Sequence, residues 1–162
     1  MAVDYSKFDE IVDIKGVKED MKNNNGKDVP EDTYDVALLD LQLGETGPNS
    51  KTPGSPMIKA KFEIINGDYE GTWVWYNQVV STGTGLNMGL GFIRSLIPDE
   101  AEHMEVRDGF LPDAVTSYAE LGELLDMLKP FIMDHFEYAL RIKKSSSGYT
   151  NYTVEEIYKL ED

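Results

Sequence analysis

The sequence predicts a mainly β domain with a helical insertion, and three observations predict it. Apolar and polar residues alternate in two separate regions, residues 34–80 and 136–160. Between these regions, apolar residues recur at intervals of three and four. Alternation with a period of two is typical of a half-buried strand, whereas intervals of three and four indicate a helix. The chain is therefore expected to form strands, then helices, then strands again.

The first strand is expected to begin near Tyr34 and to contain a β-bulge. Tyr34, Val36 and Leu38 alternate, and the pattern then slips by one residue, so that Leu39, Leu41 and Leu43 alternate instead. Such a slip is what one extra residue in a strand produces. The bent first strand of a small closed barrel often needs this device, because it pairs with neighbours on both sides.

A hairpin follows the first strand after a loop. Residues 44–56 hold three prolines and three glycines, which predicts a loop. Residues 57–65 alternate as a strand, residues 66–68 (Asn-Gly-Asp) supply turn chemistry, and residues 71–80 are rich in aromatic and β-branched residues. These two segments are expected to pair.

Two helices and a second hairpin complete the expected order. The first helix covers residues 86–97 and is stopped by Pro98; the second begins at a Ser117 cap and ends before Pro130, with a polar, acidic connection between them. Strands over residues 136–144 and 149–160 follow. Three strands, helices and two strands are the plan of a five-stranded OB-type β-barrel with its helices between strands three and four.

Length and composition limit the number of domains and the classes of protein to which the chain can belong. A chain of 162 residues fits one domain; residues 1–29 are interpreted as an N-terminal arm and linker, or a tail without a role, and residues 30–162 as the barrel domain. There is no cysteine and no apolar run long enough to cross a bilayer. We therefore expect a cytoplasmic protein without a signal peptide, a membrane anchor or thiolate chemistry.

One face of the second and third strands carries the candidate site. If Val74 and Tyr76 point inward, then Trp73, Trp75 and Asn77 point outward, on the face that also carries Lys59 and Lys61. Bases stack on aromatic rings, and cations follow the phosphates of single-stranded DNA. The alternative, in which both tryptophans face the core, stays open at this stage. Further cations are expected to extend this track: Lys51, Arg141, Lys143 and Lys144.

The net charge of −15 opposes a simple nucleic-acid interpretation, because such proteins usually carry a basic footprint. A local positive stripe on an acidic body remains compatible with it.

The acidic C-terminal segment, residues 155–162, is of a type that recruits replication partners, or it is the end of a last strand.

Motifs for catalysis and for metal binding are weak. Residues 83–91 (GTGLNMGLG) superficially resemble a dinucleotide-binding turn, but an antiparallel hairpin precedes them, so glycines that let a helix pack closely are the favoured interpretation. His103 and His135 are far apart and lack helix-spaced partners for a metal. We expect no cofactor, no metal and no enzymatic activity.

Six short motifs follow one another in the first part of the chain: SKFDE (6–10), VPEDTYDV (29–36), PMIKAKFEIING (56–67), YEG (69–71), WYNQVV (75–80) and GFIRSL (91–96). In this order they resemble a family of phage-encoded proteins of Gram-positive hosts. The resemblance covers residues 5–96 and implies an OB-fold that binds single-stranded DNA without sequence specificity in replication and recombination, within the infected host cell. It implies no cofactor and no catalysis, and it leaves open a homo-oligomer and contacts with replication proteins.

The alternative function is a phage adaptor or inhibitor that binds a protein through its acidic surface.

Overall fold

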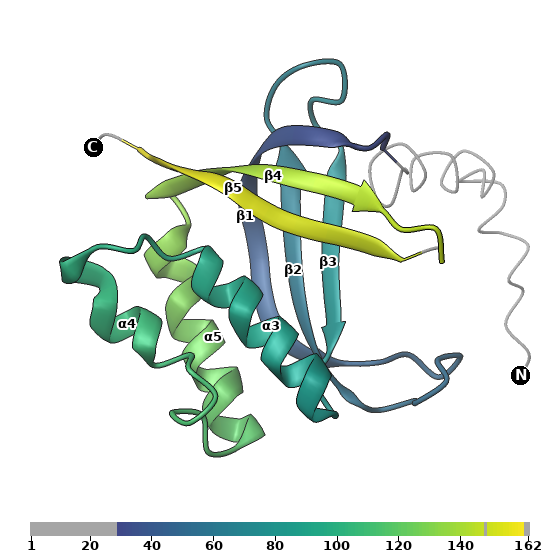
Figure 1. Cartoon of the computed structure of the whole chain (residues 1–162), viewed down its shortest axis with the longest axis vertical. Helices are drawn as coiled ribbons and strands as arrows, with labels where there is room; N and C mark the ends of the chain where they lie inside the picture. Colours follow the sequence, from purple (N-terminus) through teal and green to yellow (C-terminus); the bar gives the residue numbers. More distant parts are fainter. Residues whose placement is uncertain (1–28, 148, 161–162) are drawn as a thin grey trace, which may run out of the picture.

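The described residues form one five-stranded antiparallel sheet with helices inserted between its third and fourth strands (Figure 1). The computed structural model describes residues 29–147 and 149–160. The predicted N-terminal arm therefore lies outside the described residues, except for Val29, which is buried in the core. The strands are β1 (Asp32–Glu45), β2 (Pro56–Ile64), β3 (Trp73–Val79), β4 (Phe136–Lys144) and β5 (Thr150–Lys159), in the sheet order β3-β2-β1-β4-β5.

The first strand is shared by the two halves of the sheet. Its residues 36–45 pair with β2, and its residues 32–36 pair with β4. The register shifts between Leu38 and Asp40, which confirms the bulge predicted from the change of phase. In Figure 1, β1 crosses the top of the sheet beside β4 and then turns down alongside β2.

The core lies on the inner face of the bent sheet. Four alternate residues of β2 (Ile58, Ala60, Phe62 and Ile64) are fully buried. On β3, Val74 is 6% and Tyr76 is 7% exposed, so the prediction that they point inward is confirmed. Alternation places the two side chains on one face, because successive side chains of a strand point to opposite faces; packing against the core makes this the inner face.

Helices between β3 and β4 pack at one side of the sheet, at the lower left of Figure 1. The predicted helix after β3 is α3 (Gly83–Ser95), and the one before β4 is α5 (Tyr118–Ile132). The segment between them, expected to be a polar connection, contains the short helices η1 (Ala101–His103) and α4 (Met104–Asp108). That expectation was wrong, because helices this short carry no recognisable apolar period.

The second helix also runs further than predicted. Ser117 caps α5 as expected, since the Glu120 N–H donates to its Oγ at 3.1 Å. The helix does not end before Pro130; it continues to Ile132, which is fully buried. A proline in the last turn removes a single helical hydrogen bond, and burial of Ile132 offsets that loss.

The predicted mainly β architecture with a helical insertion is confirmed, and the sheet is open. Across residues 29–147 and 149–160, no strand pairing joins β3 to β5, so these strands form the two edges of the sheet. Closure into a barrel stays a prediction. None of the helices in the described part of the chain has the length and apolar character needed to span a membrane.

Candidate nucleic-acid interface

The outer face of β2 and β3 gathers two tryptophans and two lysines. In the register of this pair, Lys61 lies opposite Trp75 and Lys59 lies opposite Asn77. Trp73 is the next outward residue on β3 and lies opposite Glu63. Residues opposite one another on antiparallel strands share a face, so the alternation in the sequence gave the correct grouping. Both tryptophans and both lysines are partly exposed, and the alternative that buried the tryptophans in the core was wrong.

Lys61 connects the two indole rings. Its Nζ lies 3.3 Å from the ring centroid of Trp73 and 5.4 Å from that of Trp75. A cation over an indole face is stabilised by about 0.5–1 kcal/mol at an exposed site. The result is a preformed array of two aromatic planes and one ammonium group on one strip of sheet.

Lys59 is positioned by a glycine on the neighbouring strand. A Cβ atom added at Gly44 would lie 3.0 Å from Lys59 Cε and 3.1 Å from its Cδ. The aliphatic part of the lysine therefore lies close over the β1 backbone, in space that a larger residue would fill. This contact directs the side chain along the same outer face as Asn77, which is exposed.

Asp40 lies opposite Lys61 on the other side of β2 and would oppose an anionic ligand if its charge stood alone. Its Oδ1 lies 2.7 Å from the Nζ of Lys129, which reaches it from α5. The hydrogen bond from Lys129 lowers the pKa of the Asp40 carboxyl below its ordinary value, and the nearby charge of Lys61 adds to this effect. Sequence reasoning missed Lys129, because no spacing relates α5 to β1.

The remaining predicted contacts are not gathered with the tryptophans. Lys51 is exposed in the loop between β1 and β2. Arg141 and Lys143 lie on β4, which two other strands separate from β3. The Arg141 guanidinium lies 3.6 Å from the Glu155 carboxylate, so its charge is already partnered. Lys144 ends β4, and its backbone N–H donates to Glu31.

Two loops extend to the same side of the molecule in Figure 1. One joins β1 to β2 and carries Lys51; the other joins β4 to β5 and follows Lys143 and Lys144. Lys51, Lys143 and Lys144 can therefore contact a ligand only if that ligand extends beyond the strip of sheet that carries Trp73 and Trp75.

The acidic C-terminal segment is part of the sheet through Lys159. Glu155 and Glu156 lie in β5, where Glu156 pairs with Ala139 of β4 and Glu155 lies at a register shift between the two strands. Its interpretation as the end of a last strand therefore describes residues 155–159, while residues 161 and 162 lie outside the described part. Recruitment of replication partners by this segment stays a prediction.

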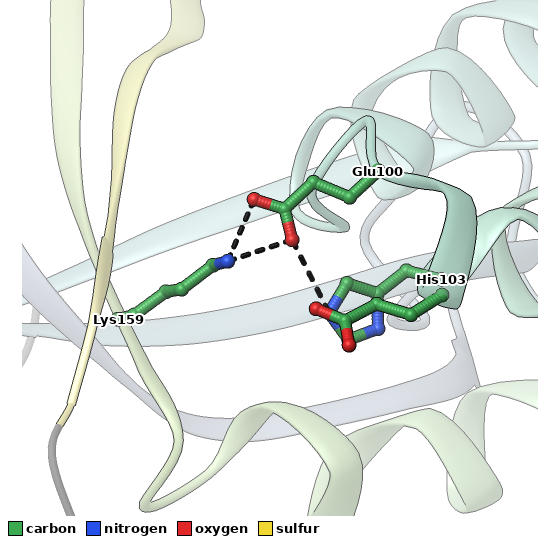
Figure 2. A network of polar contacts seen from close by, with 4 residues as sticks. Glu100, His103 and Lys159 are labelled. Carbon is green, nitrogen blue, oxygen red and sulfur yellow. Dashed lines mark hydrogen bonds and ion pairs between the residues drawn. The ribbon is translucent and has the colours of Figure 1, made fainter.

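A network of polar side chains connects the end of β5 to the helical insertion (Figure 2). Lys159 Nζ lies 2.6 Å from both carboxylate oxygens of Glu100, and His103 Nε2 lies 3.9 Å from one of them. The side chains of Glu100, Glu102 and His103 could together offer ligand atoms to a metal. The hydrogen bond from Lys159 lowers the pKa of the Glu100 carboxyl. The ammonium group of Lys159 therefore already neutralises the carboxylate that a metal ion would need as a ligand.

His103 also has a packing role that the sequence did not reveal. Its ring makes edge contacts with Phe131, at 5.4 Å between centroids, and with Phe136, at 5.9 Å. Sequence reasoning found no ligand spacing around His103, because Glu100 and Glu102 come close only through the turn of η1.

The glycine-rich segment packs the helix against the sheet. A Cβ added at Gly85 would lie 2.2 Å from the Val79 carbonyl oxygen, and one at Gly89 would lie 2.9 Å from Ile58 Cδ1. These contacts confirm the interpretation of the glycines as close-packing positions. The strand before them belongs to an antiparallel sheet, which lacks the parallel unit of a dinucleotide site.

No family model, curated protein or solved structure matches this chain. The resemblance to phage-encoded proteins therefore stays a prediction from the sequence motifs, and the function has to be argued from the site.

Proposed function

We propose that the chain binds single-stranded DNA without sequence specificity on the outer face of β2 and β3. The observation that carries the proposal is the array of Trp73, Trp75 and Lys61, in which one ammonium group lies against both indole rings. Stacking of a base on an aromatic ring contributes about 1–3 kcal/mol and tolerates any sequence, because every base has a π-face. Lys59 supplies a second cation on the same face.

We also propose that the sheet is an OB-type barrel opened between β3 and β5. The order β3-β2-β1-β4-β5, with β1 shared by both halves, supports this assignment because it would give such a barrel if the edges met. The edges approach through side chains: the rings of Tyr76 on β3 and Tyr152 on β5 make an edge contact at 5.8 Å. In such folds the face of strands two and three binds oligonucleotides, and this is the face that carries Trp73 and Trp75.

The acidic character of the chain sets the expected strength of binding. With a net charge of −15, the body of the protein repels DNA, and only a few cations lie near the indole rings. Each phosphate neutralised on a single strand contributes about −0.7 to the slope of log K against log salt. The two lysines therefore predict a slope of log K against log salt of about −1.4 and a modest affinity. From the resemblance of the sequence motifs to those of phage-encoded proteins, we propose a role in protecting single strands during phage replication or recombination in the host cytoplasm.

Titration of the protein with oligo-dT at low salt tests the proposal through tryptophan fluorescence, since Trp73 and Trp75 are the only two tryptophans. We expect quenching on binding. We expect Trp73→Ala and Trp75→Ala each to weaken binding, measured by anisotropy of a labelled oligonucleotide, by about 5- to 150-fold, the equivalent of about 1–3 kcal/mol. Lys59→Gln is expected to make the salt slope shallower by about 0.7.

Tyr158→Ala is a matched aromatic control. Tyr158 is 37% exposed on β5. Desolvation raises the pKa of its hydroxyl, and the nearby carboxylates of Asp35 and Glu156 raise it further, so these acidic surroundings repel phosphate. This variant should bind as the wild type does. Absence of both quenching and anisotropy change at micromolar protein, or equal losses in Tyr158→Ala and Trp75→Ala, would refute the proposal.

A further inference from the structure

A groove of about 390 Å³ lies between α4 and α5, in the helical insertion. Its walls include Val106 from α4 and Leu124, Met127 and Phe131 from α5, and Phe110 lies at its base. Phe110 is 2% exposed, whereas Val106 is 37% and Met127 is 70% exposed. The groove therefore reaches the core at its base and is open to solvent at its walls.

Acidic residues lie on both sides of the groove. Glu105 lines it from α4, and Asp108 lies one turn further along that helix; Glu123 lies one turn before Met127 on α5, at a spacing of four. All three are exposed. Among the residues that the structure describes, no lysine or arginine forms an ion pair with any of the three.

The basic residues of these two helices are engaged elsewhere. Arg107 of α4 lies 3.6 Å from Asp99 and donates to the Arg94 carbonyl. Lys129 of α5 lies 2.7 Å from Asp40 on β1. The groove therefore combines exposed apolar walls with a negative rim that meets no cation within the described part of the chain.

We propose that this groove binds a basic amphipathic helix of a partner protein. An apolar face of a helix fills such a groove with side chains at positions i, i+3 or i+4, and i+7, and lysines or arginines beside that face would meet the acidic rim. Leu124 to Phe131 spans about 10 Å along α5, at a rise of about 1.5 Å per residue, which matches about two turns of a bound helix. Met127 suits the role, because a flexible thioether adapts to different apolar partners.

A second copy of this chain fits the groove less well. Each copy carries a net charge of −15, so the approach of another acidic surface to the acidic rim is unfavourable. The proposal goes beyond DNA binding, because the groove lies on α4 and α5, whereas the proposed DNA contacts lie on β2 and β3.

The test uses a labelled model peptide of about 14 residues made of leucine and lysine, with its leucines at helical spacing, and measures anisotropy with the full chain in physiological salt. We expect Met127→Lys to weaken binding at least about tenfold. Met127 is largely exposed and lysine has a similar helix propensity, so the fold should persist. Met88→Lys is the matched control, because Met88 is 54% exposed on α3 and the substitution adds the same charge.

A second peptide, with serine in place of leucine and the lysines unchanged, separates groove binding from general attraction to an acidic protein. We expect the serine peptide to bind much more weakly than the leucine peptide. Equal affinities of the two peptides, equal losses in Met127→Lys and Met88→Lys, or a dimer that Met127→Lys dissociates in sedimentation would each overturn the proposal. Oligo-dT binding by Met127→Lys should equal that of the wild type, so the two surfaces are tested separately.

Discussion

Substitution by alanine at three glycines of α3 is expected to raise the stability of the fold at one position and to lower it at the others. Gly85, Gly89 and Gly91 lie within a stretch of seven residues on this helix, which spans Gly83–Ser95. Alanine favours a helix over glycine by about 1 kcal/mol in each case. What differs is the space that the added methyl group meets, and that space comes from the sheet below the helix.

The geometry at each position gives the sign and approximate size of the effect. At Gly91 the nearest atom to an added Cβ is a guanidinium nitrogen of Arg94 at 3.7 Å, an ordinary contact, so the gain of about 1 kcal/mol should be kept. At Gly89 the Cβ would lie 2.9 Å from Ile58 Cδ1 in the core, and overpacking costs about 1–3 kcal/mol. The net change there is a loss of about 0–2 kcal/mol.

Gly85→Ala is expected to be the most destabilising of the three. Its Cβ would lie 2.2 Å from the Val79 carbonyl oxygen, which is backbone, and 3.1 Å from Thr82 Oγ1, which caps the helix. Neither atom can move without shifting the end of β3 or breaking the cap. The loss should therefore reach or exceed about 3 kcal/mol.

Urea unfolding, followed by far-UV circular dichroism, measures these differences in the free energy of unfolding. A domain of this size changes its melting temperature by about 2–4 °C per kcal/mol. Gly91→Ala should therefore raise the melting temperature by about 2–4 °C, and Gly85→Ala should lower it by about 6 °C or more. The reasoning is refuted if Gly91→Ala is less stable than the wild type, or if Gly85→Ala is as stable as Gly91→Ala.

Two further predictions concern single polar contacts. The Tyr138 hydroxyl, fully buried, donates to a main-chain carbonyl at 2.7 Å; Tyr138→Phe leaves that carbonyl unsatisfied and should cost about 1–3 kcal/mol. Tyr118, 46% exposed, makes a similar bond at 2.8 Å, and Tyr118→Phe should cost less, about 0.5–1 kcal/mol; equal losses in urea unfolding would contradict this. Lys129 lowers the pKa of Asp40 in the folded state. The ion pair therefore stabilises the fold at pH values above the unfolded-state pKa of Asp40, and this stabilisation is lost as the pH falls through the folded-state pKa. The advantage of the wild type over Asp40→Asn should be up to about 1 kcal/mol at pH 6 and low salt and should shrink as the pH falls below the ordinary aspartate pKa of about 3.9; a difference that does not change with pH would exclude the mechanism.

The local sequence pattern was sufficient to predict features that depend on one strand, one strand pair or one helix end. The bulge between Leu38 and Asp40 follows from the one-residue slip in the apolar pattern. The shared outer face of Trp73, Trp75 and Lys61 follows from alternation on two paired strands. Ser117 caps α5 through a bond to the backbone three residues away.

The sequence predicted less well those features that depend on contacts between residues far apart in the chain. Pro130 looked like the end of a helix, but burial of Ile132 in the core extends α5 beyond it. The segment of α4 looked like a connection, because a helix of five residues is stable only through packing against neighbours. A contact between Arg141 and phosphate stays a prediction, but the structure adds that Glu155 on the adjacent strand lies 3.6 Å from Arg141, which no local pattern reveals.

The sequence by itself determined the order of the strands and the two longer helices, the bulge, and that Trp73 and Trp75 share one face, because periodicity and capping act within a few residues. Only the tertiary structure decided which charges remain uncompensated. Lys129 meets Asp40, Lys159 meets Glu100, and the acids beside the groove between α4 and α5 meet no cation among the described residues. The physical reason is that ion pairs and close contacts join residues far apart in the chain, whose approach depends on how the bent sheet and its helices pack together.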